Sequence, residues 1–187
     1  FEPFTTEQGL ILKDNPTGRL AEDIARHVPH AQSKVLPVSF QETRRMLNQC
    51  FDELAPTIWL GLGFAPHRTT VDIECVALNI EHCIRPDNDG ERPFLRPIIE
   101  NGPLAYETQL DASRAIDTLT KRGISATVSL HAGTFLCNQT FYLGCHRGAT
   151  VGTPQIATFI HVPPLPEYTQ LAAGLAHLLR GLSGSGH

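Results

Sequence analysis

An excess of positive charge and a long apolar run are both missing from this sequence. There are 15 Lys and Arg against 19 Asp and Glu, for a formal net charge of −4. This balance argues against a nucleic-acid partner, since binding the phosphate backbone needs a basic face. No apolar run approaches the roughly 20 residues that a membrane-spanning helix requires, so we also expect no membrane partner.

Paired cysteine motifs are missing as well. The five cysteines are an odd number, and none forms a Cys-x-x-Cys pair. This pattern favours free thiols in a reducing compartment over a disulfide framework or a zinc site. We therefore expect a cytoplasmic protein without a structural metal.

The hydrophobic content is sufficient for one folded domain. With 187 residues, of which 41% are hydrophobic, the chain can bury a substantial core. We expect this domain to cover residues 1–182. Residues 183–187, SGSGH, have the composition of a linker leading into a tag and are left out of the fold prediction.

Apolar patterns of strand and helix type alternate along the chain. The expected strands are 35–38, 57–63, 69–80, 126–130 and 155–162, and the expected helices include 41–54, 111–122 and 168–182. A further helix begins at Asn15-Pro16, with Asn15 as its N-cap. This alternation predicts an α/β sandwich around a largely parallel sheet. The Pro- and Gly-rich excursion 85–103 is long enough to suggest a functional or interface loop.

One cysteine has a local context that favours reactivity. Ala126, Val128 and Leu130 predict a buried strand, and a glycine turn follows at Gly133-Thr134. Cys137 comes next, where a helix should begin. A thiol there faces the positive end of the helix dipole, which favours the nucleophilic thiolate. The spacing alone leaves both a catalytic and a packing role open for Cys137. We interpret the remaining cysteines as packing residues: Cys50, Cys75, Cys83 and Cys145.

A histidine and a carboxylate could complete a nucleophilic site. His161 ends an apolar strand, so it is either a general base for a nearby thiol or a satisfied polar group of the core. Glu74 lies within an apolar extended run, where an unpaired carboxylate would be costly. It either orients the histidine, as in a triad, or pairs with Arg68 or Arg85.

Asp87 is the competing carboxylate. It lies in Pro86-Asp87-Asn88-Asp89-Gly90, a run typical of turns. Asp87 could therefore be either a turn residue or the third member of a triad.

Nine motifs occur in a fixed order along the chain: FEPF, Asn15-Pro16, LPVSF, WLGLG, ECVALN, PDNDG, GPLAYETQL, GISATVSLHAGTFLCN and FIHVP. This set resembles the pyroglutamyl peptidase I family, also called pyrrolidone-carboxylate peptidases, which are cysteine peptidases. The match extends from Phe1 to about Pro164. The combination of GTFLCN, FIHVP and an upstream glutamate carries the resemblance, because any one of them alone would be weak.

The resemblance implies a three-layer α/β/α fold and a Cys-His-Glu triad. Cys137 would be the nucleophile, His161 the base and Glu74 the third member, with Asp87 as a second choice for that third role. It also implies hydrolysis of peptides that carry an N-terminal pyroglutamyl residue, with no cofactor and no metal.

The same resemblance implies a substrate pocket lined by Phe1, Phe4 and Phe135. A pyroglutamyl end is a neutral lactam, so apolar walls and a few amide hydrogen bonds suit it. The family tends to form homodimers or homotetramers, and the excursion 85–103 is a plausible contact.

Two departures and two alternatives stay open. The family has a strand ahead of FEPF, so we expect residues before Phe1 to supply one, and Cys75 stands where an arginine commonly follows the glutamate. The alternatives are a nucleoside phosphorylase-like enzyme of related fold and an inactive module that binds pyroglutamyl ends. A phosphorylase would need an arginine cluster or a glycine-rich phosphate loop at a strand end, which the sequence does not offer convincingly.

Overall fold

The computed structural model describes residues 1–2, 4–5, 11–12 and 15–183, and side chains only at 1–2 and 15–183. The helices in these ranges are α1 (Pro16–His27), α2 (Phe40–Leu54), α3 (Ala112–Thr120), α4 (Leu136–Val151) and α5 (Thr169–Ser183). The strands are β1 (Phe4–Thr5), β2 (Ile11–Leu12), β3 (Ile58–Phe64), β4 (Val71–Glu74), β5 (Val76–Leu78), β6 (Ala105–Glu107), β7 (Ala126–Ser129) and β8 (Ile156–Val162).

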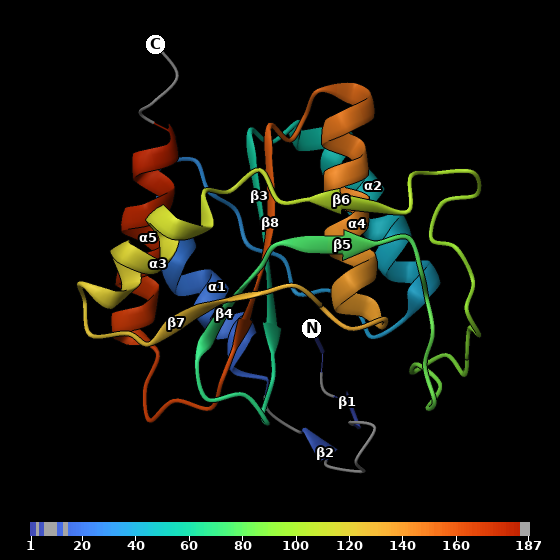
Figure 1. Ribbon diagram of the computed structural model, residues 1–187, viewed down its shortest axis with the longest axis horizontal. Helices are drawn as coiled ribbons and strands as arrows, with labels where there is room; N and C mark the ends of the chain where they lie inside the picture. Colours follow the sequence, from blue (N-terminus) through green and yellow to red (C-terminus); the bar gives the residue numbers. More distant parts are fainter. Residues whose placement is uncertain (3, 6–10, 13–14, 184–187) are drawn as a thin grey trace.

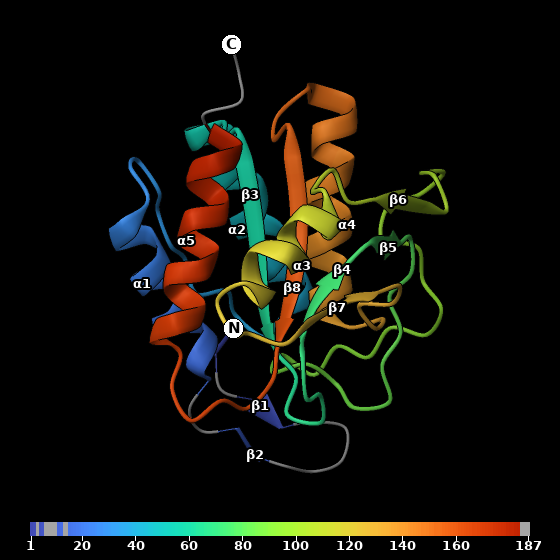
Figure 2. The same cartoon turned by 60° about the vertical axis from the view of Figure 1, so that its left-hand side comes forward.

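The main sheet has the strand order β3-β8-β4-β7. The outer pairs β3–β8 and β4–β7 are parallel, whereas the two central strands β4 and β8 are antiparallel. Helices α1, α3 and α5 cover one face, and α2 and α4 cover the other (Figure 1). Figure 2 shows the strands in this order, with α3 and α5 in front of them and α2 and α4 behind. The predicted three-layer α/β/α sandwich is therefore confirmed.

The two faces of the sheet have different cores. Alternation along β3 sends Leu60 and Leu62 toward the α1–α5 side, where they pack on Ile160 and Val162. Trp59 belongs to the opposite core, under α2 and α4, together with Phe159. Gly61 and Gly63 share the face of Trp59, so β3 carries no side chain there beyond the tryptophan. At Gly63 this bare backbone lies against Cys137, in the first turn of α4.

Local capping chemistry explains where three helices begin. The Asn15 side chain accepts a hydrogen bond from the Thr17 N–H, and Pro16 follows it at the first helical position, so this predicted cap is confirmed. Ser39 caps α2 by accepting from Glu42 N–H. Asp111 caps α3 by accepting from Arg114 N–H, as its position before the apolar pattern predicts.

Three strand predictions differ from the structure. Residues 35–38 form no strand, and Pro37, which lacks a backbone N–H, cannot contribute fully to a ladder. The segment 126–130 does form β7, but not as a buried strand: Val128 is 45% exposed and Leu130 68% exposed. The reason is its position, because β7 is the outermost strand on its side of the sheet. The extended run 69–80 is two strands, β4 and β5, interrupted at Cys75.

The other outer strand, β3, borders a groove of about 440 Å³ between α1 and α2. The additional strand expected ahead of Phe1 stays a prediction. Within the described ranges, no helix is long and apolar enough to cross a membrane.

Candidate active site

The site is built around Gly63. A Cβ atom placed on this glycine would lie 2.9 Å from His161 Cδ2 and 3.0 Å from Cys137 Sγ. Both distances are shorter than ordinary contacts, so the imidazole and the thiol converge on the bare backbone of β3. The sequence places these two residues 24 positions apart, and the fold brings them together at one glycine.

The thiol lies in the first turn of α4. The helix begins at Leu136, so Cys137 is its second residue, as the strand-turn-helix pattern predicts. Gly133 adopts φ of 82°, which glycine tolerates and which lets the chain turn from β7 toward the helix. The N–H groups of a first helical turn lack partners within the helix and carry partial positive charge. The thiol therefore sits beside donors that favour an anion.

Two buried amides fix this helical turn. Asn138 accepts from Leu78 N–H at 2.9 Å and donates to the carbonyls of Leu78 and Ile80, each at 2.9 Å. Gln139 donates to Phe40 O at 3.0 Å and to a Glu81 carboxylate oxygen at 2.7 Å. Both amides are fully buried. They clamp the first turn of α4 to the chain after β5 and to α2, and the sequence pattern did not single them out.

His161 and Glu74 face each other across the central strands. His161 Nδ1 lies 2.6 Å from Glu74 Oε1, and the carboxylate is fully buried. Burial would lower the pKa of His161, but the charge and hydrogen bonding of Cys137, together with Glu74, raise it to about 9. Burial likewise opposes ionisation of Glu74, yet the hydrogen bond with His161 and the charge of Arg68 hold its pKa below the usual value. The raised pKa of His161 and the lowered pKa of Glu74 favour an imidazolium and a carboxylate at neutral pH.

Glu74 also has the second partner that the sequence left open. Arg68 Nη1 donates to the same oxygen, Oε1, at 2.8 Å. Glu74 therefore contacts the histidine and forms the salt bridge with Arg68 at the same time. The other arginine considered for it, Arg85, is exposed in the loop after β5.

Asp87 has a different environment. Its Oδ2 accepts from the Phe40 N–H at 2.8 Å, and its Oδ1 accepts from the backbone N–H groups of Asp89 and Glu91 at 3.0 and 2.8 Å. The carboxylate thus ties its own turn to the start of α2. The structure places Glu74, and not Asp87, against His161.

An aromatic wall lies next to Cys137. Phe135, the residue before α4, packs edge-on against Phe40 with ring centroids 5.2 Å apart. Phe1 packs against the same cluster, which includes Val38 and Leu136. The side chain of Phe4 lies outside the described residues, although its backbone opens β1. Two of the three predicted pocket phenylalanines therefore belong to one apolar cluster beside the thiol.

The remaining cysteines do not share this context. No disulfide joins cysteines of the described residues, in which Cys83 and Cys145 are buried and Cys50 and Cys75 half-buried. Burial raises the pKa of Cys145 to about 12. Searching the described residues also yields no group of three or more His, Cys, Asp or Glu that could hold a metal ion.

The site combines a thiol at a helix N-terminus with an imidazole and a buried carboxylate, on an α/β/α sandwich. These are the components of a cysteine-type hydrolase. Comparison with known proteins is more specific. The family model described as pyroglutamyl peptidase matches residues 1–177. The chain therefore belongs to the pyroglutamyl peptidase family.

Named relatives agree with this assignment. A pyrrolidone-carboxylate peptidase of Pyrococcus furiosus is 39% identical over 170 residues, which cover 89% of this chain and 79% of the relative. One from Bacillus cytotoxicus is 35% identical over 176 residues, covering 92% and 80%. A crystal structure of pyrrolidone carboxyl peptidase from Pyrococcus furiosus superposes with a TM-score of 0.88 at 32% identity, covering 97% of this chain and 94% of that one.

Proposed function

We propose that this member of the family removes N-terminal pyroglutamyl residues from peptides, with Cys137 as nucleophile, His161 as acid and base, and Glu74 as the group that orients His161. The observation that carries the proposal is the convergence of Cys137 Sγ and His161 on Gly63, with Glu74 on the far side of the imidazole. Membership of the family supports hydrolysis over the phosphorylase-like and the inactive-module alternatives.

The reaction proceeds in two steps. The Cys137 thiolate attacks the pyroglutamyl carbonyl carbon, and backbone N–H groups at the start of α4 stabilise the oxyanion. The C–N bond breaks as the His161 imidazolium gives its proton to the leaving amine, and a thioester remains. His161 then takes a proton from water, which attacks the thioester; the C–S bond breaks, pyroglutamate is released, and the Cys137 thiolate and the His161 imidazolium are restored. Glu74 stays ionised throughout and stabilises the imidazolium.

The aromatic cluster accounts for the choice of substrate. A pyroglutamyl ring is neutral, whereas an ordinary peptide N-terminus is a solvated ammonium. Phe1 and Phe135 offer apolar surface and no carboxylate that would compensate an ammonium, and we propose Phe4 as a third wall. A free amino terminus would lose its hydration there without gaining a partner.

The test is release of p-nitroaniline from pyroglutamyl p-nitroanilide, with prolyl and glutaminyl p-nitroanilides as controls. We expect turnover of the first substrate and not of the controls. Cys137→Ala or prior treatment with iodoacetamide should abolish it. Full turnover by Cys137→Ala would rule out the thioester mechanism.

A matched pair of variants separates the two carboxylates. Glu74→Gln should lower kcat by two orders of magnitude or more, because the imidazole loses its negatively charged partner. Asp87→Asn should change mainly stability, because one of its two accepting oxygens becomes an NH2 group that cannot accept a backbone hydrogen bond. The reverse ranking of kcat would transfer the third role to Asp87.

We further infer that the protein works in the cytoplasm as a homodimer or homotetramer. The described residues form no disulfide, which suits a reducing compartment. Large apolar side chains gather on the excursion after β5, where Ile84, Phe94 and Leu95 are 69%, 77% and 57% exposed. Light scattering coupled to size exclusion would give the oligomeric state, and Phe94→Glu should shift it toward the monomer if this loop is the contact.

A further inference from the structure

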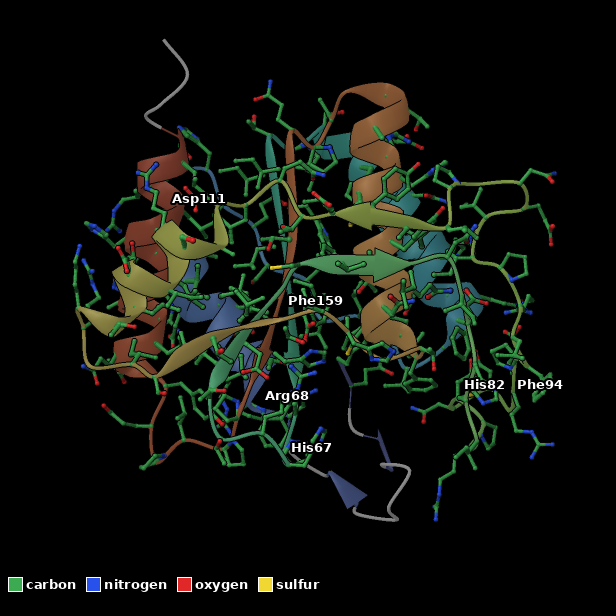
Figure 3. The ribbon with its side chains drawn as sticks, in the orientation of Figure 1. His67, Arg68, His82, Phe94, Asp111 and Phe159 are labelled. Atoms are coloured by element: carbon green, nitrogen blue, oxygen red, sulfur yellow. The ribbon has the colours of Figure 1, made fainter. Side chains whose placement is uncertain are left out.

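A second ion pair continues the line of charges beyond Glu74. Arg68 lies in the turn between β3 and β4, at the end of the sheet where Figure 3 labels it. Its Nη1 donates to Glu74 Oε1 at 2.8 Å and to Asp72 Oδ2 at 2.5 Å, and its Nη2 reaches His131 O at 3.3 Å. The guanidinium is largely buried, with 19% of its side chain exposed. It is therefore held between two carboxylates rather than placed in solvent.

Asp72 is placed by the sheet itself. In the antiparallel ladder of β4 and β8 it stands directly opposite His161. Asp72 is 8% exposed. Besides the hydrogen bond from Arg68, its side chain accepts one from the Thr70 hydroxyl, which donates to Oδ1 at 2.5 Å. A carboxylate this buried needs a cation to stay ionised. Arg68 supplies this cation by forming an ion pair with Asp72.

The charges alternate in sign along five side chains. From the nucleophile outward they are the Cys137 thiolate, the His161 imidazolium, the Glu74 carboxylate, the Arg68 guanidinium and the Asp72 carboxylate. The central oxygen, Glu74 Oε1, is shared by His161 Nδ1 and Arg68 Nη1. Two cations therefore compete for one carboxylate oxygen.

We propose that Arg68 and Asp72 are positioning residues, which fix Glu74 and set how strongly it holds His161 as an imidazolium. The inference rests on the proposed function, since it concerns the same imidazole. Arg68 weakens the attraction of Glu74 for His161, and Asp72 in turn weakens the effect of Arg68. Together they adjust the pH range over which the thiolate–imidazolium pair persists.

The signs follow from the charges that surround His161. Strand β4 contributes Glu74 and Asp72, the turn before it contributes Arg68, α4 contributes Cys137, and β3 contributes uncharged Gly63. Neutralising Arg68 removes a like charge close to the imidazolium, so the imidazolium survives to higher pH. Neutralising Asp72 leaves the charge of Arg68 uncompensated, so the imidazolium is lost at lower pH. The two variants should therefore shift in opposite directions.

The experiment measures kcat/KM for the pyroglutamyl amide against pH in Arg68→Gln, Asp72→Asn and the double variant. The alkaline limb reports loss of the imidazolium. We expect this limb to rise by about one pH unit in Arg68→Gln and to fall by roughly half a unit in Asp72→Asn. In the double variant it should return close to that of the unmodified protein.

Two further variants separate positioning from folding. Arg68→Lys keeps the charge but lacks the second nitrogen that reaches His131 O while Nη1 holds both carboxylates, so kcat should fall several-fold while the limb moves little. Arg147→Gln is the matched control, because Arg147 is also largely buried, with 25% of its side chain exposed, and pairs at 2.8 Å with Asp52 of α2, away from the site. It should leave the limb unchanged.

Opposite shifts with a compensating double variant would support the proposal. Limbs that stay in place, or that both move in the same direction, would overturn it even if kcat falls. Should Arg68→Gln fail to fold, the downward shift in Asp72→Asn still decides the matter. An unmodified protein without pyroglutamyl amidase activity would instead overturn the proposed function.

Discussion

Replacing Gly63 by alanine should lower kcat even in molecules that remain folded, so the loss of activity should exceed what the loss of stability alone would cause. The new methyl group would lie 2.9 Å from His161 Cδ2, 2.9 Å from Phe159 Cε1 and 3.0 Å from Cys137 Sγ. Two of these three neighbours are the proposed nucleophile and the proposed base. To restore ordinary contacts, each must retreat by about half an ångström.

The magnitude can be worked from this displacement. Adding one methyl group to a packed core costs about 1–3 kcal/mol of stability. A shift of about 1 Å at reacting groups costs on the order of 10²-fold in rate, so about half that shift predicts a roughly 10-fold lower kcat. That factor corresponds to about 1.4 kcal/mol in the barrier. KM should change little, because the aromatic cluster is not displaced.

Gly61→Ala is the matched control. The three atoms nearest to its methyl group would be ring atoms of Phe159 and Trp59, the latter at 2.7 Å, and none of them belongs to Cys137 or His161. It should destabilise the fold at least as much as Gly63→Ala while kcat stays within about 3-fold. The assay is kcat for pyroglutamyl p-nitroanilide per folded molecule, with thermal melts of each variant. An unchanged kcat in Gly63→Ala, or an equal loss in Gly61→Ala, would refute the reasoning.

Three other outcomes are expected. Phe135→Ala should raise KM several-fold with a smaller change in kcat, because it removes a proposed wall of the substrate pocket, whereas Phe135→Leu should restore most of the affinity. The folded-state pKa of His161 of about 9 lies above its unfolded value of 6.5. Its stabilisation is therefore complete below about pH 6.5 and lost as pH rises through about 9, which urea titrations of the protein and of His161→Gln would resolve. Cys145, whose pKa burial raises to about 12, should stay unmodified by iodoacetamide at pH 8 while Cys137 reacts, as peptide mass spectrometry would show.

Features that depend on neighbouring residues in the chain were predictable from the sequence. The Asn15 and Asp111 caps and the helix start before Cys137 are set within a few residues, and each was found where it was expected. His161 at the end of its strand is of the same kind. In each case, residues within a few positions along the chain determine the local structure.

Features that depend on strand order were not predictable. Val128 and Leu130 have the same β-forming pattern at an edge as at the centre, and their exposure follows from β7 being outermost. The role of Gly63 needs the register that sets it beside His161. Asp72 was missed for the same reason, since its position opposite His161 is a cross-strand relation.

Glu74 shows a further limit. The sequence offered a histidine or an arginine as its partner, and the structure gives one carboxylate oxygen to both. A sequence pattern identifies which groups could pair, but the number of partners around one atom depends on the packed structure.

The antiparallel pairing of β4 and β8 has a consequence for how activity is lost. The partners Glu74 and His161 stand on the two central strands, joined by ladder hydrogen bonds and covered by helices on both faces. Backbone at the centre of a sheet opens only with the whole domain, whereas loops and ends open locally. Heating should therefore leave this carboxylate–imidazole pair intact until the cooperative transition. Amide hydrogens of residues 72–74 and 159–161 should be among the last to exchange with deuterium.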